Sequence, residues 1–328
     1  MTGKLERTGG RISRRSFHRR AGAGGLAAGA ASWLWAAGAG RGASRQARLA
    51  FRASGNEFPF DTGLLRGVLR SEGRSHGLGP VVYVPSGKHI ARGFGLFSHY
   101  RLLDDRARYG RAAWDWAGRA RLAEDGSVEV FWPADSEHPF QMRAVYRWSA
   151  PNTLDLQTTV VARRQLRRFE VFLASYFQGF GRSLVYVVGS PEAGARFLEV
   201  ERAAGVWQMF PRDEAAVAII RDGRWRRPPN PVQWKIMPRL AAPLAVRRDP
   251  PSGLAGVVMA PPDDCFAVAT PYGQEPHRSL YLSLLGRRLE PDRPATARAR
   301  LVIGQGISDA QVVALYEAYV AGLRSSGR

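Results

Sequence analysis

The chain has 328 residues, 45% of them hydrophobic, and its single cysteine, Cys265, excludes an intramolecular disulfide. The formal net charge is +20, yet no helix-turn-helix, zinc-finger or RNA-binding signature accompanies it. Because the cations are nearly all arginines spread evenly along the chain, we predict no nucleic-acid partner. A weak attraction to acidic polysaccharides or an anionic envelope surface stays open.

An arginine pair, Arg14-Arg15, lies near the N-terminus, between Ser13 and Phe17 and ahead of the small apolar run Ala21–Ala39. This pattern is typical of a bacterial twin-arginine export signal. We therefore predict a signal over residues 1–39, the twin-arginine translocation machinery as a partner, and a periplasmic or secreted location. No later stretch approaches the roughly 20 apolar residues of a membrane helix, so no permanent span is expected.

After a predicted linker over residues 40–60, short runs with alternating apolar and polar residues indicate β-strands in a single domain, residues 61–328. The expected strands, in chain order, are Leu64–Leu69, Val81–Val84, Arg119–Leu122, Val128–Trp132, Gln141–Trp148, Thr153–Val161, Phe169–Tyr176, Leu184–Val188, Val206–Phe210, Ala216–Ile220, Gly256–Ala260, Phe266–Thr270, Ser279–Leu284 and Ala297–Ile303.

One helix is expected, over residues 308–323. Ser308 and Gln311 have the spacing of a capping box. Apolar residues then recur on one helical face, namely Val312, Leu315, Tyr316, Tyr319, Val320 and Leu323. Many strands with a single closing helix predict a mainly β fold, a large antiparallel sandwich.

Three segments carry a resemblance to a known family: His138–Thr158, Phe172–Phe177 and Asp264–Ile303. The first is similar to the paired strands that cross the middle of mutarotases, the second to their His-Ser-Tyr-Phe segment, and the third to their closing strands. Together they resemble the galactose mutarotase-like superfamily. The resemblance implies a large antiparallel β-supersandwich and a sugar as the ligand.

The same resemblance implies that the usual catalytic pair is missing. Aldose mutarotases use a His as general acid and a Glu as general base. These positions fall on Ala174 and near Ala267 in this chain. Since alanine cannot transfer a proton, standard mutarotase activity is not expected.

Sugars bind to flat aromatic faces, with charged or amide groups bonding their hydroxyls. A first cluster of this kind runs from residue 98 to residue 116. It offers His99 as a candidate proton-transfer group, and four candidate substrate-binding residues: Arg101, Tyr109, Trp114 and Trp116. Packing of the two tryptophans at a sheet edge is the alternative.

A second cluster follows an apolar run at Tyr272. Glu275 and His277 form a candidate acid–base couple, and Arg278 could neutralise a carboxylate or an oxyanion. Tyr272 is a candidate substrate-binding residue of the same loop. A solvated turn is the alternative.

The remaining candidate substrate-binding residues are Tyr176, Arg212 and Trp225, although Arg212 could simply pair with Asp213 at the surface. No cofactor motif is present. The histidines of residues 40–328 lack metal-ligand spacing, so neither a cofactor nor a metal is predicted.

The sequence therefore predicts an exported carbohydrate-binding protein. Two alternatives stay open: a sugar epimerase or polysaccharide lyase that acts on acidic glycans, and an envelope scaffold that docks another protein. Whether the protein is an enzyme is left undecided.

Overall fold

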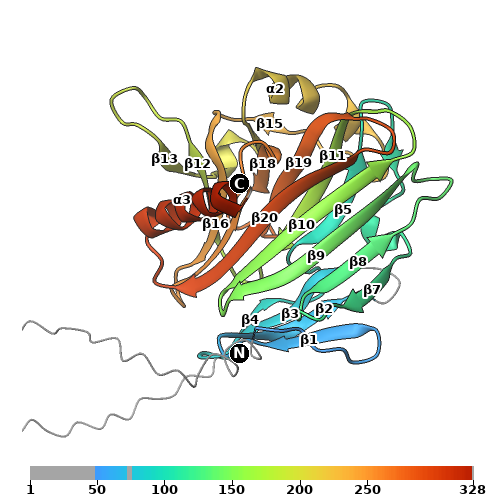
Figure 1. The fold of residues 1–328 in the computed structure, drawn as a ribbon. Helices are drawn as coiled ribbons and strands as arrows, with labels where there is room; N and C mark the ends of the chain where they lie inside the picture. Colours follow the sequence, from blue (N-terminus) through green and yellow to red (C-terminus); the bar gives the residue numbers. More distant parts are fainter. Residues whose placement is uncertain (1–48, 72–75, 327–328) are drawn as a thin grey trace, which may run out of the picture. The chain divides into compact units, whose positions relative to one another are not determined.

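The computed structural model describes residues 49–71 and 76–326. The predicted signal, residues 1–39, lies outside them. The described part is built from three β-sheets and, as predicted, is a mainly antiparallel β-sandwich with a C-terminal helix (Figure 1). The smallest sheet has four strands in sequence order: β1 (Glu57–Asp61), β2 (Leu65–Arg70), β3 (Gly77–Tyr83) and β4 (Lys88–Ala91).

A nine-stranded sheet forms one layer of the sandwich. Its strands, in spatial order, are β13 (Arg196–Glu199), β12 (Arg182–Val187), β16 (Leu240–Asp249), β17 (Leu254–Met259), β20 (Pro294–Gln305), β10 (Thr153–Ala162), β9 (Phe140–Ala150), β8 (Val128–Trp132) and β7 (Arg119–Leu122).

A seven-stranded sheet forms the other layer and carries the candidate site. Its spatial order is β15 (Lys235–Ile236), β14 (Trp207–Pro211), β18 (Cys265–Pro271), β19 (Ser279–Leu289), β11 (Leu166–Tyr176), β5 (Ser98–Leu103) and β6 (Arg108–Tyr109). Within this sheet β14 and β15 pair in parallel, and the other neighbouring strands pair antiparallel.

The main core lies between the two large sheets, and strands such as β8, β9 and β10 alternate in burial across it. On β8, Val128, Val130 and Trp132 are buried while Glu129 and Phe131 are half-exposed. Apolar residues on the inner face of β11 and β19 join the same cluster. Each sheet therefore presents one apolar face to the other, as expected for a sandwich.

The small sheet packs on this core through aromatic residues that precede the predicted domain. Phe51, Phe58 and Phe60 are buried, and the Phe60 ring lies 4.7 Å from that of Trp148 on β9. Residues 49–60, part of the predicted linker, are thus packed against the domain. Phe58 and Phe60 are alternate residues of β1, a short run that the sequence interpretation overlooked.

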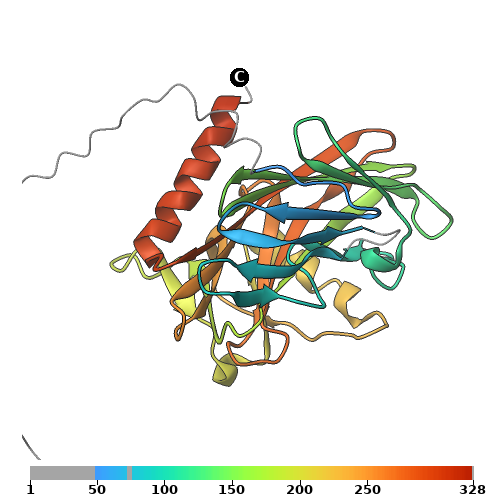
Figure 2. The ribbon, with the colours of Figure 1, turned by 90° about the horizontal axis from the view of Figure 1, so that it is seen from below.

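The helix α3 (Asp309–Ser326) confirms the prediction for the C-terminus. The Ser308 backbone N–H donates to Gln311 Oε1 at 2.8 Å, and the Gln311 N–H donates to Ser308 Oγ at 3.2 Å. Val312 and Tyr316 pack into a cluster with strands β16, β17 and β20. Figure 2 shows the helix along the side of the sandwich.

One predicted strand was wrong, and some strands were missed. Residues 216–220 read as a strand, but they belong to helix α2 (Glu214–Ile220) because Asp213 accepts a hydrogen bond from the Ala216 N–H at 2.8 Å and caps it. The interpretation also missed β16, whose apolar run is interrupted by Pro243. Residues 98–101, the start of the first predicted cluster, lie in β5, which was not among the expected strands.

None of the helices in residues 49–71 and 76–326 is both long enough and apolar enough to cross a membrane.

Candidate functional site

A cavity of about 370 Å³ opens on the outer face of the seven-stranded sheet. We call it the aromatic hollow. Its floor comes from outward-facing residues of β5, β11 and β19, and its wall from the segment between α2 and β15. The lining residues are Tyr100, Arg101, Phe172, Tyr176, Trp207, Trp225, Asn230, Pro231, Val232, Trp234, His277 and Tyr281.

Strand periodicity places these side chains. On β11, Phe172 and Tyr176 point outward, while Val171 and Leu173 point into the main core. A register shift between β5 and β11 at Phe172/Leu173 turns Arg101 to the same outward face. Neighbouring strands therefore add their side chains to one surface.

The aromatic rings of the hollow are held in fixed mutual orientations. Tyr100 stacks on Trp114 with ring centroids 4.5 Å apart and planes inclined by 2°. Phe172 stacks on Tyr281 at 4.5 Å, and Trp234 stands nearly perpendicular to Trp225 at 5.2 Å. The hollow thus presents preorganised aromatic surfaces, of the kind that the C–H face of a sugar contacts.

Arg101 brings a buried positive charge to this aromatic surface. The residue is 3% exposed, and its guanidinium carbon lies 5.0 Å from the Tyr100 ring and 5.2 Å from the Trp225 ring. Nη2 donates to the Asn230 carbonyl at 2.6 Å. Nε and Nη1 have no hydrogen-bond partner among the described residues. Because Nε carries one N–H and Nη1 two, three N–H groups of a buried cation are left for a ligand.

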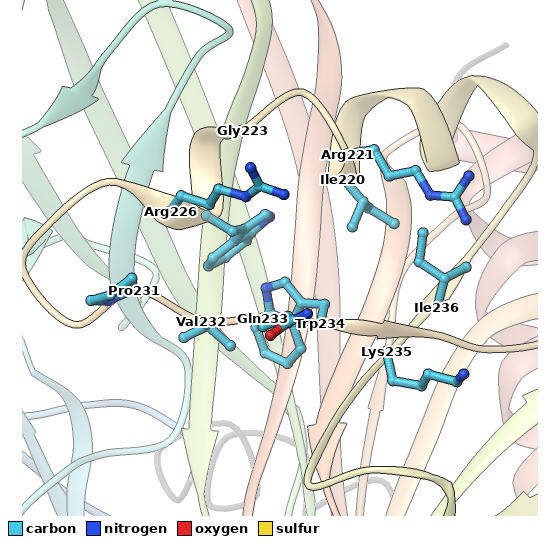
Figure 3. Close-up of a pocket in the computed structure, with 11 residues that line it drawn as sticks. Ile220, Arg221, Gly223, Arg226, Pro231, Val232, Gln233, Trp234, Lys235 and Ile236 are labelled. Atoms are coloured by element: carbon cyan, nitrogen blue, oxygen red, sulfur yellow. The ribbon is translucent and has the colours of Figure 1, made fainter.

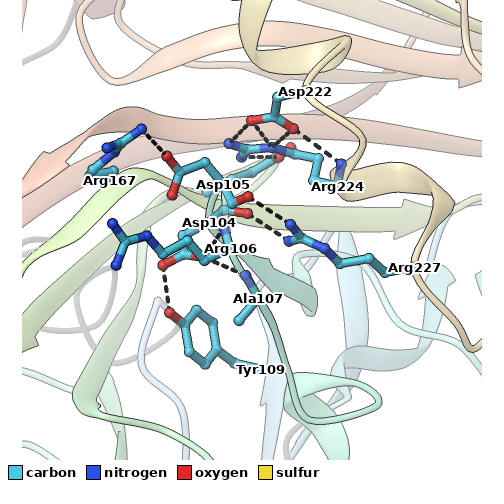
Figure 4. A network of polar contacts seen from close by, with 10 residues as sticks. Asp104, Asp105, Arg106, Ala107, Tyr109, Arg167, Asp222, Arg224 and Arg227 are labelled. Atoms are coloured by element: carbon cyan, nitrogen blue, oxygen red, sulfur yellow. Dashed lines mark hydrogen bonds and ion pairs between the residues drawn. The ribbon is translucent and has the colours of Figure 1, made fainter.

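A buried ion-pair network fixes the wall of the hollow (Figure 4). Arg224, next to Trp225, pairs with Glu170 of β11 at 3.0 Å and with Asp222 at 2.8 Å, and neither Arg224 nor Glu170 has an exposed side chain. Burial raises the pKa of Glu170, although Arg224 opposes the shift. Breaking such a pair is costly, so Trp225 is anchored to the sheet.

A second pair of bonds ties the wall to the loop after β5. Arg227 donates to the carbonyls of Asp104 and Asp105 at 2.9 and 2.7 Å (Figure 4). The wall is therefore connected to the same strand that carries Tyr100 and Arg101.

Two tyrosines on the floor are neutral hydrogen-bonding groups at neutral pH. Burial raises the pKa of Tyr281 to about 12, and burial also raises the pKa of Tyr176 well above its ordinary value. Ser279 Oγ donates to the Tyr281 hydroxyl at 2.7 Å. Neither phenol is poised to act as a base at neutral pH.

The rim contains the acid–base couple that the sequence predicted. Glu275 is buried, and its carboxylate lies 2.7 Å from His277 Nδ1 and accepts the His277 backbone N–H at 2.9 Å. The His277 side chain is 52% exposed. With Nδ1 bonded to the carboxylate, Nε2 is left to face a ligand.

Two further cavities border the aromatic hollow. The Arg278 hollow, about 410 Å³, is lined in part by Arg92, Phe94, Tyr176, His277 and Arg278. The Arg226 hollow, about 860 Å³, is lined in part by Arg221, Trp225, Arg226, Trp234 and Lys235. Figure 3 shows Arg221 and Arg226 on the side of α2 and the turn after it, with Lys235 on the facing segment.

Several predicted site residues come together here. Arg101, Tyr176, Trp225 and His277 line the aromatic hollow. Trp114 reaches it through its stack on Tyr100 and Glu275 through its bond to His277, while Arg278 lines the adjoining hollow.

His99 lies elsewhere, although it was a predicted catalytic residue. It is 1% exposed and faces the main core, where Nε2 is 2.9 Å from Thr158 Oγ1 and Nδ1 is 3.3 Å from the Tyr146 hydroxyl. Burial lowers the pKa of His99 to about 3. Because β5 turns this side chain inward, it does not border the hollow.

Four predicted substrate-binding residues also lie away from the hollow. Tyr109 is buried and donates to Asp104 at 2.6 Å, and Trp116 is buried and stacks on His138 at 4.0 Å. Arg212 pairs with Asp213 at 2.8 Å, the surface pair that was the alternative. Tyr272 packs on the main core.

Sequence reasoning did not select Trp234, Tyr281 or Phe172 as site residues. The alternation of strand residues could have identified Phe172 and Tyr281, since each aromatic side chain occupies an outward position of its strand. Trp234 follows a proline-rich connection whose path over the sheet no local pattern predicts.

The two alanines singled out by the resemblance lie on the same outward face. Ala174 pairs with Tyr281, and Ala267 pairs with Ser283 on the same strand, β19. Both alanines are fully buried in the cluster beneath the hollow. No proton-transfer group stands at either position.

The described residues contain no group of three or more His, Cys, Asp or Glu side chains that could hold a metal ion.

No protein-family model matches the chain, and no curated protein matches it either. Among solved structures it is similar to the Slr1438 protein from Synechocystis, with 12% identity, a TM-score of 0.47, and 79% of this chain and 96% of that chain covered.

Two proteins from Lactobacillus acidophilus are also similar in structure. A galactose mutarotase related enzyme has 10% identity and a TM-score of 0.45 over 76% of this chain and 98% of its own. A galactose 1-epimerase has 12% identity and a TM-score of 0.43 over 79% and 98%. At this level of similarity, function has to be inferred from the hollow itself.

Proposed function

We propose that the aromatic hollow binds a carbohydrate. The observation that carries this proposal is the combination of buried and half-buried aromatic rings, packed against one another, with a buried arginine whose Nε and Nη1 have no hydrogen-bond partner among the described residues. Rings supply flat contact surfaces for the C–H faces of a sugar, and the arginine supplies directional hydrogen bonds.

We further propose that the protein binds carbohydrate but does not catalyse the standard mutarotase reaction. In the resemblance to that superfamily, the general acid and the general base fall on Ala174 and near Ala267. Across the sheet, Ala174 pairs with Tyr281 and Ser98, and Ala267 pairs with Ser283 and Pro211. Opening and closing the sugar ring requires a general acid and a general base, so other residues would have to take both roles.

The Glu275–His277 couple favours a second candidate function, an epimerase or lyase that moves a proton on a bound sugar. Glu275 would orient the imidazole through Nδ1, and Nε2 would accept the proton. Replacement of His277 by Gln should then abolish turnover while glycan binding persists. Unchanged turnover, or its absence in the wild type, would leave binding as the function.

We propose export through the twin-arginine route as the setting for this function. The support is the Arg14-Arg15 motif and the apolar run that follows it. Replacing both arginines by Lys should hold the precursor in the cytoplasm, as measured by cell fractionation. Normal export of that variant would contradict the proposal.

A glycan array tests the binding proposal. The wild-type chain is compared with Trp207→Ala and Trp234→Ala, which remove rings that line the hollow. Phe131→Ala is the matched control, since Phe131 is a half-exposed ring on the outer face of the nine-stranded sheet.

We expect the wild type and the control to bind one glycan class and both hollow variants to lose roughly tenfold in affinity. Thermal unfolding of each variant shows that the fold is retained. Absence of binding by the wild type, or equal loss in the control, would contradict the proposal and favour the scaffold alternative.

A further inference from the structure

The three cavities form a row on one side of the molecule. The aromatic hollow shares Trp225, Pro231, Val232 and Trp234 with the Arg226 hollow. It shares Tyr176 and His277 with the Arg278 hollow. Because the two outer hollows share no lining residue, the aromatic hollow lies between them. The row is therefore longer than a site for one sugar unit requires.

Each hollow of the row is lined by cations, and none is lined by a carboxylate. Arg221, Arg226 and Lys235 line the first, Arg101 the second, and Arg92 and Arg278 the third. Glu275 lies next to His277 of the rim, and its carboxylate is bonded to His277 Nδ1. A concave surface of one charge sign favours a ligand of the opposite sign.

These six cations are also free of ion pairs with the described carboxylates, whereas arginines such as Arg182 and Arg300 on the nine-stranded sheet are paired. Arg101 is the most telling, since a buried guanidinium with unpartnered Nε and Nη1 is costly unless a ligand satisfies it. Arg278 likewise has a buried, unpartnered Nε. At least two of the hollows therefore have an arginine with hydrogen-bond donors that no described residue satisfies.

We propose that the row binds an acidic polysaccharide, with successive sugar units in the three hollows and an anionic group of the middle unit at Arg101. This inference rests on the proposed carbohydrate binding and adds the chemical class and the length of the ligand. The anionic group can be a carboxylate or a sulfate, since both accept hydrogen bonds from arginine.

The test measures binding of the full chain by calorimetry to polygalacturonate and to chondroitin sulfate. Carboxyl-reduced polygalacturonate is the neutral control with the same linkage, and single-stranded DNA tests a different class of polyanion. Galacturonate oligomers of one to six units test the length of the site.

We expect at least one acidic polymer to bind and the reduced polymer to bind at least tenfold more weakly. Affinity should rise with oligomer length beyond a single unit, and it should fall with added salt. Desulfated chondroitin, which keeps the carboxylates of chondroitin sulfate, separates the two groups. If chondroitin sulfate binds and its desulfated form does not, the anionic group at Arg101 is a sulfate. If polygalacturonate or the desulfated polymer binds, it is a carboxylate.

Variants assign the binding to the row. Arg101→Gln should weaken binding roughly ten- to hundredfold, and Arg226→Gln and Arg278→Gln less. Arg101→Lys, which keeps the charge, should retain part of the affinity and shows that the loss is not caused by misfolding. Arg66→Gln, on the small sheet and paired with Asp61, is the control and should change nothing.

Equal binding of the reduced polymer, with the tryptophan variants still impaired, would overturn the acidic ligand while leaving carbohydrate binding intact. Preference for DNA, or affinity independent of oligomer length, would also overturn the inference. Absence of binding to every polymer and to every array glycan would overturn both proposals.

Discussion

Acidification from pH 7 to pH 5 is expected to destabilise the protein through His99. This imidazole is fully buried between the sheets, and burial lowers its pKa from 6.5 to about 3. The unfolded chain takes up a proton near pH 6.5, whereas the folded chain does not until about pH 3. The contribution of neutral His99 to the free energy of unfolding is therefore fully present above pH 6.5, and it is lost as the pH falls toward 3.

The size of this effect follows from the two pKa values. At pH 5, proton uptake by His99 in the unfolded chain lowers the free energy of unfolding by about 2 kcal/mol. His99→Gln keeps a group that can bond to Thr158 and Tyr146 but does not titrate. The variant should be less stable than the wild type at pH 7. Between pH 7 and pH 5, however, its free energy of unfolding should fall by about 2 kcal/mol less than that of the wild type.

Urea unfolding followed by tryptophan fluorescence at pH 7, 6 and 5 gives the free energies of unfolding for both proteins. Parallel acid profiles for the wild type and His99→Gln would refute the assignment of His99 as a neutral core residue. That result would reopen the possibility that its ring reaches solvent.

Other parts of the fold give three more predictions. Glu170→Gln should lower the free energy of unfolding by about 3 kcal/mol, because it leaves the buried Arg224 with one carboxylate partner instead of two; a loss below 1 kcal/mol in urea unfolding would argue against a buried pair. Burial raises the pKa of Cys265 to about 12, so a maleimide at pH 8 should label it only after unfolding, as mass spectrometry can show. Fast labelling of the native chain would be inconsistent with that burial. Ser308→Ala removes half of the reciprocal cap with Gln311 and should cost about 1 kcal/mol, seen as faster hydrogen exchange in the first turn of α3; unchanged exchange would mean that the cap is dispensable.

Strand periodicity was sufficient to predict much of the sandwich. Val128–Trp132 was predicted with the bounds of β8, because alternation of apolar residues reports directly on one buried face. Arg119–Leu122 was also predicted with the bounds of β7, although no residue of this strand is buried. The prediction failed at residues 216–220, where a β-branched run resembles a strand locally. Only the cap at Asp213 and the packing of α2 reveal the helix.

The site was less accessible to sequence reasoning, since it depends on which face each side chain takes. His99 and Arg101 are two residues apart and would share a face in a regular strand, yet the register shift in β5 sends one into the core and the other into the hollow. The Pro-rich connection that brings Trp234 over the sheet has no periodicity from which its path could be predicted. The couple of Glu275 and His277 was predictable because a short turn holds both residues.

Saturation-transfer difference NMR tests carbohydrate binding in the aromatic hollow most directly. A mixture of neutral and acidic oligosaccharides is added to the full chain, and the aromatic protons of the protein are irradiated. We expect transfer to the ring protons of one sugar class, strongest on one face of the ring, and its loss in Trp234→Ala but not in Phe131→Ala. Absence of transfer to any sugar, or equal transfer in Trp234→Ala, would contradict the assignment of this hollow as the binding site.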